Sequence, residues 1–444
     1  MKLQHKLSTS MKQPVLSYQQ ILRQYGLSPT QLKDYVYCGN MDIKPWELYI
    51  SVINLHICEL LDVIVPILKK TEASFKLIKD EKAHNGLNAG DYGEDQIGKV
   101  VVLYPKTKTE MLMLITAINL VTQKFNGPLC PTAQRIGKVL YADKSAFIKA
   151  IKNQVEKRCI RRKRNRLLGK YYVPVSIIKT SFKGTAYKAV SLRKLSFKTC
   201  LIKEGNPFAL DDHWGRTIKD RLLWQKKVLL DLRDDITTPS FYDYFEENEY
   251  SYLVIQYVEG NNLFDVVRTM YGDQNWNEIS NKQQQTLLNY FLNVLDIVDT
   301  LHKKGFVQRD ISDSNFLIME DGRLCIIDFE LSYNVHTKEP EHPFPLGSIG
   351  YASPEQLRME CPDYKADIYS LGALLCFILT GIPPKHFITG DKKKMGLKLS
   401  NLLHDSRLTS VIIRCLAQNP AERPELLQLK IATQTFIHTI KQEL

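Results

Sequence analysis

The sequence predicts an α+β protein made of two folded regions that are joined by a basic linker. At 444 residues the chain is too long for a single hydrophobic core. Residues 1–156 mix strand and helix patterns, residues 170–260 are rich in strands, and residues 280–444 are mainly helical. Strands followed by helices are typical of a two-lobed α+β domain. The run KRCIRRKRNR at 157–166 separates the two regions, and we interpret residues 157–169 as an exposed linker because like charges repel and stay solvated.

Hydrophobic periodicity predicts the elements of the first region. Residues 48–55 and 99–104 are apolar runs of strand length, whereas 59–69 and 109–124 repeat their apolar residues with helical spacing. In the second region, residues 214–232 predict one long polar helix among the strands.

Composition narrows the class of protein. Hydrophobic residues make up 44% and charged residues 24%, which is ordinary for a globular protein and excludes global disorder. The formal net charge of +12 is compatible with nucleic acid, a membrane surface or an acidic peptide as partner. We expect no nucleic-acid partner, because the basic run itself contains no aromatic residue that could stack on bases.

The cysteines and the apolar runs predict where the protein is located and whether it binds zinc. None of the nine cysteines forms a CxxC pair, so we expect reduced thiols, no zinc and a cytoplasmic protein. The N-terminus lacks the apolar stretch of a signal peptide. The apolar run at 371–384 is short and interrupted by Gly and Pro, so it predicts a buried helix and no transmembrane segment.

Two acidic motifs carry the predicted chemistry. The stretch from Gln308 to Asn315 has an Asp and an Asn five positions apart, and an apolar strand then ends at Asp328. This pattern resembles the catalytic loop and metal-binding triplet of protein kinases, with Gln308 in place of His and Glu330 in place of Gly. The resemblance implies that Asp310 is the catalytic carboxylate beside the attacking hydroxyl, and that Asn315 and Asp328 bind Mg²⁺.

The residues upstream resemble a nucleotide-binding lobe. Lys203 follows two apolar residues, as does the kinase lysine that pairs with the ATP phosphates, and the resemblance gives it a catalytic role as well. Gly184 is the one glycine kept in the loop expected over the phosphates. Backbone groups of Gln256 and Val258 would contact adenine. Gln225 stands where kinases carry the Glu that pairs with the lysine, so it would hydrogen-bond Lys203 without supplying a charge.

Three further residues resemble the structural anchors of a kinase. Residues 350–355 resemble the end of a kinase activation segment, with Glu355 as the last residue. Arg423 resembles the buried arginine that forms an ion pair with this glutamate. Asp367 resembles the buried Asp that ties a central helix to the catalytic loop. Matches in this order predict a bilobal protein-kinase fold with its N-lobe at 170–260 and its C-lobe at 261–444. It would use ATP or another NTP with Mg²⁺ to phosphorylate Ser or Thr.

With these motifs, the chain as a whole resembles the class III lanthipeptide synthetases, which join a phosphoserine/phosphothreonine lyase, a kinase and a cyclase. The kinase strand at 202–207 and the Asp328-Phe329-Glu330 triplet are usual for that family. The N-terminal half carries lyase landmarks. These are residues 46–51, Phe75-Lys76, Leu87-Asn88, Gly98-Lys99, Tyr104-Pro105 and Gly127-Pro128.

The resemblance breaks at the lyase chemistry. Glu47 and Tyr49 stand where the family has the Lys and His of its first motif. The family's later basic residues fall on Gly90, Glu94 and Ala142. Lys76, as candidate base, remains, together with Arg135. Elimination of phosphate needs an acid, a base and cations around the leaving group, so we expect a phosphothreonine-lyase-like fold at 1–156 that is degenerate in activity.

The resemblance implies a role in a multi-protein pathway. We find no cyclase segment, so the expected partners are a precursor peptide with Ser and Thr residues and a full-length synthetase or a separate lyase and cyclase. Two alternatives stay open. The chain could be a pseudokinase and pseudolyase that binds leader peptide or partner synthetase, as Gln225 and the sparse glycines suggest, or a general signalling kinase with an unrelated N-terminal domain.

Overall fold

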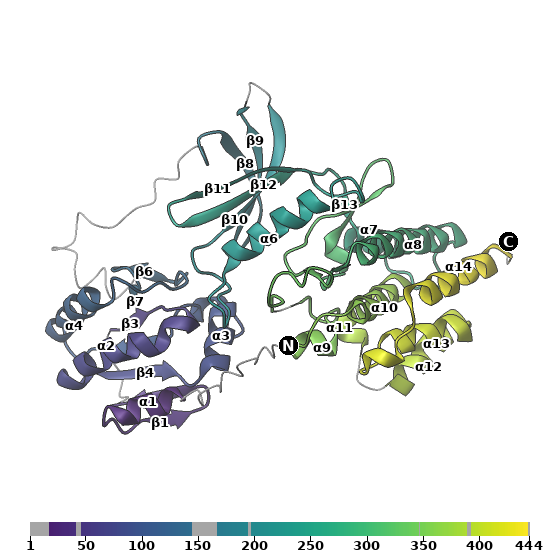
Figure 1. The fold of residues 1–444 in the computed structure, drawn as a ribbon. Coiled ribbons are helices and arrows are strands. Elements are labelled where there is room, and N and C mark those ends of the chain that lie inside the picture. Colours follow the sequence, from purple (N-terminus) through teal and green to yellow (C-terminus); the bar gives the residue numbers. More distant parts are fainter. Residues whose placement is uncertain are drawn as a thin grey trace, which may run out of the picture.

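A computed structural model describes residues 17–40, 46–143, 167–193, 197–345, 347–388 and 392–442. The basic run at 157–166 lies outside these residues. The described chain forms an amino-terminal domain (17–143), a five-stranded lobe (167–256) and a helical lobe (261–442), drawn in purple to blue, teal, and green to yellow in Figure 1.

The amino-terminal domain is built on an antiparallel β-sheet. Seven strands pair in the order β1-β2-β4-β5-β3-β7-β6 in the described residues. They are β1 Thr30–Leu32, β2 Tyr35–Cys38, β3 Leu48–Ile50, β4 Ser74–Ile78, β5 Val101–Tyr104, β6 Ala133–Arg135 and β7 Leu140–Asp143. The helices are α1 Tyr18–Gln24, α2 Ile57–Lys70, α3 Glu81–Ala89 and α4 Lys108–Val121. Their apolar faces and the sheet bury one common core.

Periodicity located three of the four predicted elements of this domain. Residues 59–69, 99–104 and 109–124 correspond to α2, β5 and α4. The strand predicted at 48–55 is wrong beyond Ile50, because a 3-10 turn at Asn54–His56 leads directly into α2. Val52 and Ile53 are buried in this connection, so their apolar character reflects burial in a loop rather than a strand.

The five-stranded lobe is an antiparallel sheet with one long helix. Its strands pair in the order β11-β12-β10-β9-β8. They are β8 Tyr172–Ser181, β9 Gly184–Ser191, β10 Lys198–Gly205, β11 Phe241–Glu247 and β12 Tyr250–Gln256. Helix α6, Ile218–Asp231, packs against the sheet and corresponds to the helix predicted at 214–232. The pair Thr217 and Asp220 begins it with a capping box.

The helical lobe packs long helices around a central buried one. Helix α10, Tyr364–Thr380, is buried at every residue from 366 to 379, so the buried helix predicted at 371–384 exists but ends at Gly381. The other helices and short strands include α7 Leu263–Tyr271, α8 Asn281–Lys303, α13 Ser406–Cys415, α14 Leu426–Gln442, β13 Asn261–Asn262, β14 Phe306–Val307, β15 Phe316–Ile318 and β16 Leu324–Ile326. Short elements α9 Pro354–Leu357, α11 Pro384–Phe387, α12 Lys392–Leu403 and β17 Tyr333–Asn334 complete it.

Hydrogen bonds join the amino-terminal domain to the five-stranded lobe. The carboxylate of Asp211 accepts from the backbone N–H of Asn54 at 2.8 Å and from Asn88 Nδ2 at 2.9 Å. Burial raises the pKa of Asp211 to about 7, although both donors act to lower it. A second contact is the ion pair between Arg135 and Glu249, at 3.3 Å.

Two expectations concern membranes and cysteines. Within the described ranges, no helix has the length and apolarity that a bilayer crossing requires. The eight cysteines of those ranges are free thiols, and Cys159 lies outside them.

Candidate active site

Asp367 holds the backbone of the predicted catalytic loop, residues 308–315. This fully buried carboxylate on α10 accepts hydrogen bonds from the backbone N–H groups of Gln308 and Arg309, each at 2.8 Å. His302 Nε2 reaches the same carboxylate at 2.8 Å. Arg309 has φ 61, a left-handed conformation that the two hydrogen bonds hold in place. Asp367 therefore lies where the sequence predicted, between the central helix and the loop.

Asp310 lies beside Asn315 on this loop. Asn315 Nδ2 donates to the Asp310 carboxylate at 2.8 Å and to its backbone carbonyl at 2.9 Å. The other carboxylate oxygen of Asp310 accepts from the hydroxyl of Ser348 at 2.7 Å. Asp310 thus already binds one hydroxyl group, which is the contact a general base needs with an attacking alcohol.

Asp328 is brought to the same place by the backbone. Ile327 N–H donates to the Asn315 carbonyl at 3.1 Å, so the end of β16 lies against the catalytic loop. Asp328 Oδ2 is 2.9 Å from Lys203 Nζ, which comes from the central strand β10 of the other lobe. The predicted residues Lys203, Asp310, Asn315 and Asp328 therefore meet between the two lobes.

Lys203 is buried among acceptors. Its Nζ lies 3.0 Å from Gln225 Oε1 on α6 and 3.6 Å from the carboxylate of Glu330. Burial lowers the pKa of Lys203, but the carboxylates of Asp328 and Glu330 raise it further, so the side chain stays charged. The predicted hydrogen bond between Gln225 and Lys203 is present. The contact with Glu330 was not anticipated from the sequence.

The oxygen donors of Asp328 and Asn315 fit the ligand preference of Mg²⁺. Asp328 offers carboxylate oxygens, and Asn315 turns its amide nitrogen towards Asp310, which leaves its amide oxygen for a cation. When bound there, Mg²⁺ would neutralise the charge that develops on the transferred phosphate. The described residues hold no group of three or more His, Cys, Asp or Glu side chains arranged for a metal ion.

The structure also places Gly184, predicted over the phosphates, and Gln256 and Val258, predicted to contact adenine. Gly184 begins β9 with φ 151, and a Cβ atom there would lie 1.7 Å from the Glu204 carbonyl, so the close approach of β9 to β10 requires glycine. Gln256 ends β12, where its N–H donates to the Ser240 carbonyl at 2.8 Å. Val258 follows in the half-buried connection between the lobes. Their contact with adenine stays a prediction.

The predicted structural ion pair is present in the helical lobe. The guanidinium of Arg423 donates to both carboxylate oxygens of Glu355, from Nη1 at 2.5 Å and from Nη2 at 2.8 Å. The Arg423 side chain is fully buried and that of Glu355 is 7% exposed. A two-point contact of this kind fixes direction as well as distance, and it anchors the segment that follows Ser348.

A second set of anchors was missed by sequence reasoning. The guanidinium of Arg216 lies 4.2 Å from the ring centre of Phe344 and donates to the carbonyls of His342 and Pro343. The ring of His342 stacks on Trp214 at 4.1 Å. Residues just before α6 therefore hold the segment between Asp328 and Glu355. No local pattern signals these contacts, because the partners are over 100 residues apart.

The three residues predicted as lyase-like remnants lie in one row of the seven-stranded sheet. Strand pairing places Arg135 opposite Tyr141, Tyr141 opposite Tyr49, and Lys76 two strands beyond. With strands about 4.8 Å apart, Lys76 and Arg135 are roughly 19 Å apart in a flat sheet. Arg135 instead contacts Glu249 and the Lys138 carbonyl. The structure thus places all three predicted residues on one face but does not bring the two cations together.

The side chains around Tyr49 and Lys76 do not form the cluster of cations that a phosphate-binding site needs. Tyr49 donates its hydroxyl to Glu47 at 2.8 Å, and burial together with that carboxylate raises the pKa of the Tyr49 hydroxyl. Lys76 lies 4.5 Å from the centre of the Tyr35 ring, and Lys99 lies 4.5 Å from that of Tyr49. Burial lowers the pKa of Lys76.

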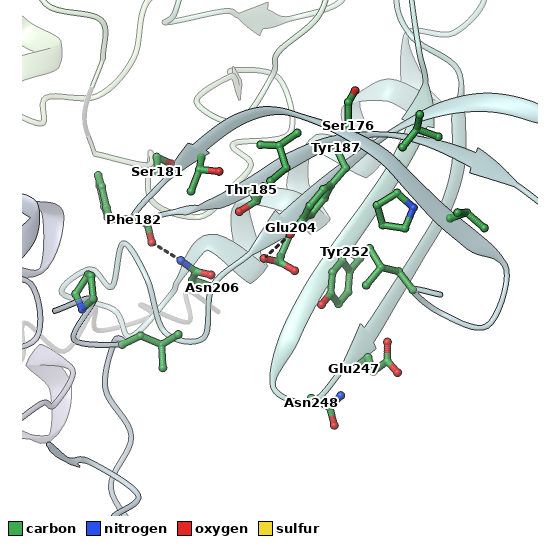
Figure 2. Close-up of a pocket in the computed structure, with 18 of the residues that line it drawn as sticks. Ser176, Ser181, Phe182, Thr185, Tyr187, Glu204, Asn206, Glu247, Asn248 and Tyr252 are labelled. Atoms are coloured by element: carbon green, nitrogen blue, oxygen red, sulfur yellow. Dashed lines mark hydrogen bonds between the residues drawn. The ribbon is translucent and has the colours of Figure 1, made fainter. Parts of the chain in front are cut away.

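A separate pocket of about 1170 Å³ lies on the far side of the five-stranded sheet. Figure 2 shows Tyr187, Glu204 and Tyr252 lining it, with Asn206 bonded to the carbonyl of Phe182. Because Glu204 follows Lys203 in β10, the two side chains point to opposite faces. Leu129, Pro131 and Glu94 of the amino-terminal domain line it too, so the pocket is distinct from the nucleotide site.

Comparison with known protein families gives one match on each side of residues 166–231. Residues 232–436 match the family described as "Protein kinase domain". This part of the chain is therefore similar to protein kinase domains. Residues 39–165 match "RamC, N-terminal domain". The kinase-domain match begins after Lys203 and Gln225, in line with the unusual glycine loop and helix that precede it.

Relatives of the kinase domain carry serine/threonine-kinase names. Serine/threonine-protein kinase B from Synechocystis sp. is 30% identical over 230 residues, 50% of this chain and 38% of that relative. Serine/threonine-protein kinase PknA from Nostoc sp. is 25% identical over 266 residues, 58% of this chain and 45% of the relative. Aurora kinase from Saccharomyces cerevisiae is 26% identical over 223 residues, 48% of this chain and 58% of the relative. The chain spans less than half the length of the two bacterial relatives.

Proposed function

We propose that this chain is an ATP-dependent kinase that phosphorylates Ser and Thr hydroxyls of a peptide. The observation that carries the proposal is the convergence of Lys203 and Asp328, 2.9 Å apart, with the hydrogen-bonded pair Asp310 and Asn315. These side chains come from both lobes and from three separate stretches of sequence. The printed names of the relatives agree with this reaction class.

Each residue has a distinct task in the proposed reaction. Asp310 orients the substrate hydroxyl and accepts its proton as the oxygen attacks the γ-phosphorus of ATP. The bond from that phosphorus to the bridging oxygen breaks, and ADP leaves with the electron pair. Lys203 holds the phosphates, and Asp328 and Asn315 supply oxygens for Mg²⁺. Most of the rate enhancement in such a reaction comes from positioning and charge neutralisation.

For the substrate we propose a ribosomal precursor peptide of class III lanthipeptide biosynthesis. The match of residues 39–165 to the RamC N-terminal domain supports this, together with the lyase-like landmarks in the sequence. We propose that the amino-terminal domain has a lyase-like fold without elimination activity, and that a full-length synthetase or separate enzymes complete the rings.

The test compares acceptor residues in one peptide. The protein is incubated with Mg·ATP and a precursor-type peptide that contains Ser and Thr, and intact masses are recorded. We expect mass gains of whole phosphate groups, and none in a matched peptide whose Ser and Thr are all Ala. Phosphate on Tyr alone, or none on any peptide while ATP is bound, would contradict the proposal.

The pocket of Figure 2 favours a second candidate function, the binding of a peptide or partner without catalysis. Val175 and Ile177 of β8 line it with apolar side chains that are 63% and 51% exposed. Val175→Asp should weaken the binding of a fluorescent precursor peptide, whereas Leu120→Asp, on the exposed face of α4, should not. Equal affinities of both variants and the wild type would remove this candidate.

A further inference from the structure

The ammonium group of Lys203 needs a counter-charge that α6 does not give. The α6 side chain that reaches it is the amide of Gln225, which is fully buried and accepts at 3.0 Å. Gln225 also donates through Nε2 to the Ile327 carbonyl at 3.3 Å. This amide joins α6 to the strand before Asp328, but it leaves the charge of a buried lysine unbalanced.

Asp328 alone is a poor permanent partner for Lys203. Its carboxylate lies 2.9 Å from the ammonium group, but the same oxygens are the expected ligands of Mg²⁺. With Mg²⁺ bound, the Asp328 carboxylate would be shared between the metal ion and Lys203. A second carboxylate near Lys203 would keep the charge compensated while nucleotide is bound.

Glu330 is placed to be that second carboxylate. It lies two residues after Asp328, its side chain is 13% exposed, and one oxygen is 3.6 Å from Lys203 Nζ. Its other oxygen is 3.6 Å from Lys183 Nζ, at the turn between β8 and β9. Glu330 therefore links the central strand of the lobe to the loop expected over the phosphates.

Helix α6 also carries a buried cation. Arg221 lies one turn before Gln225 on α6 and is 1% exposed. Its Nε and Nη1 atoms have no hydrogen-bond partner in the described residues, and its guanidinium lies 5.1 Å from the Phe344 ring centre.

We propose that Glu330 is a positioning residue that replaces the missing helix carboxylate. Glu330 supplies the lasting negative charge for Lys203. This inference rests on the proposed function, because it assigns a role within the same nucleotide site.

A competing role for Glu330 predicts the opposite result. As a carboxylate near Lys183 and Lys203, it could instead occupy the place of the ATP phosphates and inhibit binding. Its removal would then tighten Mg·ATP binding. The direction of the change in affinity therefore separates a positioning residue from an inhibitor.

The test exchanges the charge between the two positions. Glu330→Gln should weaken Mg·ATP binding in calorimetry and raise KM for ATP by about tenfold, because the buried Lys203 ammonium loses the carboxylate 3.6 Å away. Glu330→Gly combined with Gln225→Glu should recover most of the lost affinity relative to Glu330→Gly alone. Glu246→Gln, at an exposed ion pair with Lys219 in the same lobe, is the matched control and should bind as the wild type does.

The outcomes separate the two proposals. Wild-type transfer with unchanged affinity in Glu330→Gln, or no gain from the added Gln225→Glu, would overturn the role of Glu330 and leave the kinase proposal intact. Tighter binding in Glu330→Gln would replace positioning with inhibition. A wild type that neither binds Mg·ATP nor transfers phosphate would overturn both.

Discussion

Ser348 donates its hydroxyl to the carboxylate of Asp310 at 2.7 Å. The two residues are 38 positions apart, and the backbone N–H of Ser348 lies 3.3 Å from the same oxygen. Ser348 lies seven residues before Glu355, so the Arg423–Glu355 pair and this hydrogen bond fix the two ends of a short segment. The catalytic carboxylate is thus oriented from two sides, by Asn315 and by Ser348.

Removal of the Ser348 hydroxyl should slow the reaction without unfolding the protein. Ser348→Ala loses one hydrogen bond to a charged acceptor, so we expect kcat to fall about 3- to 30-fold with little change in KM for ATP. Ser348→Thr keeps the hydroxyl and is the control. Steady-state kinetics with a Ser/Thr peptide would show the difference, and equal kcat for Ala and Thr would contradict it.

Asp328→Ala should abolish Mg²⁺-dependent nucleotide binding, because it removes the carboxylate between Lys203 and the metal site. Calorimetry with ATP in the presence and absence of Mg²⁺ measures this directly. Asp321→Asn, on an exposed ion pair with Arg323, should bind normally. Nucleotide binding by Asp328→Ala at wild-type affinity would place the metal elsewhere.

The Glu355–Arg423 pair should be a major contributor to stability. Glu355→Gln leaves a buried guanidinium without its charged partner and should lower the free energy of unfolding by about 3–5 kcal/mol. Asp299→Asn breaks an exposed pair with Lys303 and should cost less than about 1 kcal/mol. Urea unfolding followed by tryptophan fluorescence compares them, and similar losses would argue against a special role for the buried pair.

Asp211 should make the junction between the two regions sensitive to pH. Burial raises its folded pKa from 3.8 to about 7, so the folded state binds the extra proton between these values. The contribution to stability is then fully present below pH about 4 and is lost as pH rises through about 7, at up to roughly 1.4 kcal/mol per pH unit. Asp211→Asn should flatten this part of a stability–pH profile measured by thermal unfolding, whereas Asp234→Asn at the surface should not. A profile unchanged in Asp211→Asn would exclude this titration.

The amino-terminal domain should not eliminate phosphate by itself. Lys76 and Arg135 lie far apart in one row of the sheet, and Glu47 lies beside Tyr49, where the leaving group would need a cation. The protein alone should leave a phosphoserine peptide intact, and mass spectrometry would detect any loss of phosphoric acid. Dehydroalanine formed without a partner enzyme would contradict this prediction.

The sequence located most of the site because its residues lie in short motifs with fixed spacing. Asp310, Asn315 and Asp328 could be found from local pattern alone, and Lys203 from its strand. The contact of Glu330 with Lys183 joins residues about 150 positions apart, and the stacking of Phe344 on Arg216 joins residues over 120 apart. Such pairings depend on how the lobes pack, which periodicity does not encode. The strand predicted at 48–55 failed for a related reason, since burial in a loop and in a strand give similar apolar runs.

The most direct test of the account is the rate of phosphate transfer from γ-labelled ATP to a Ser/Thr peptide by the wild type and by Asp310→Asn. We predict Mg²⁺-dependent transfer by the wild type, and a rate lower by about 10²–10⁴-fold in the variant, because the general base is lost while Mg·ATP binding is kept. Equal transfer by both proteins, or Mg·ATP bound by the wild type with no transfer to any peptide, would contradict the assignment of Asp310 and of the kinase function.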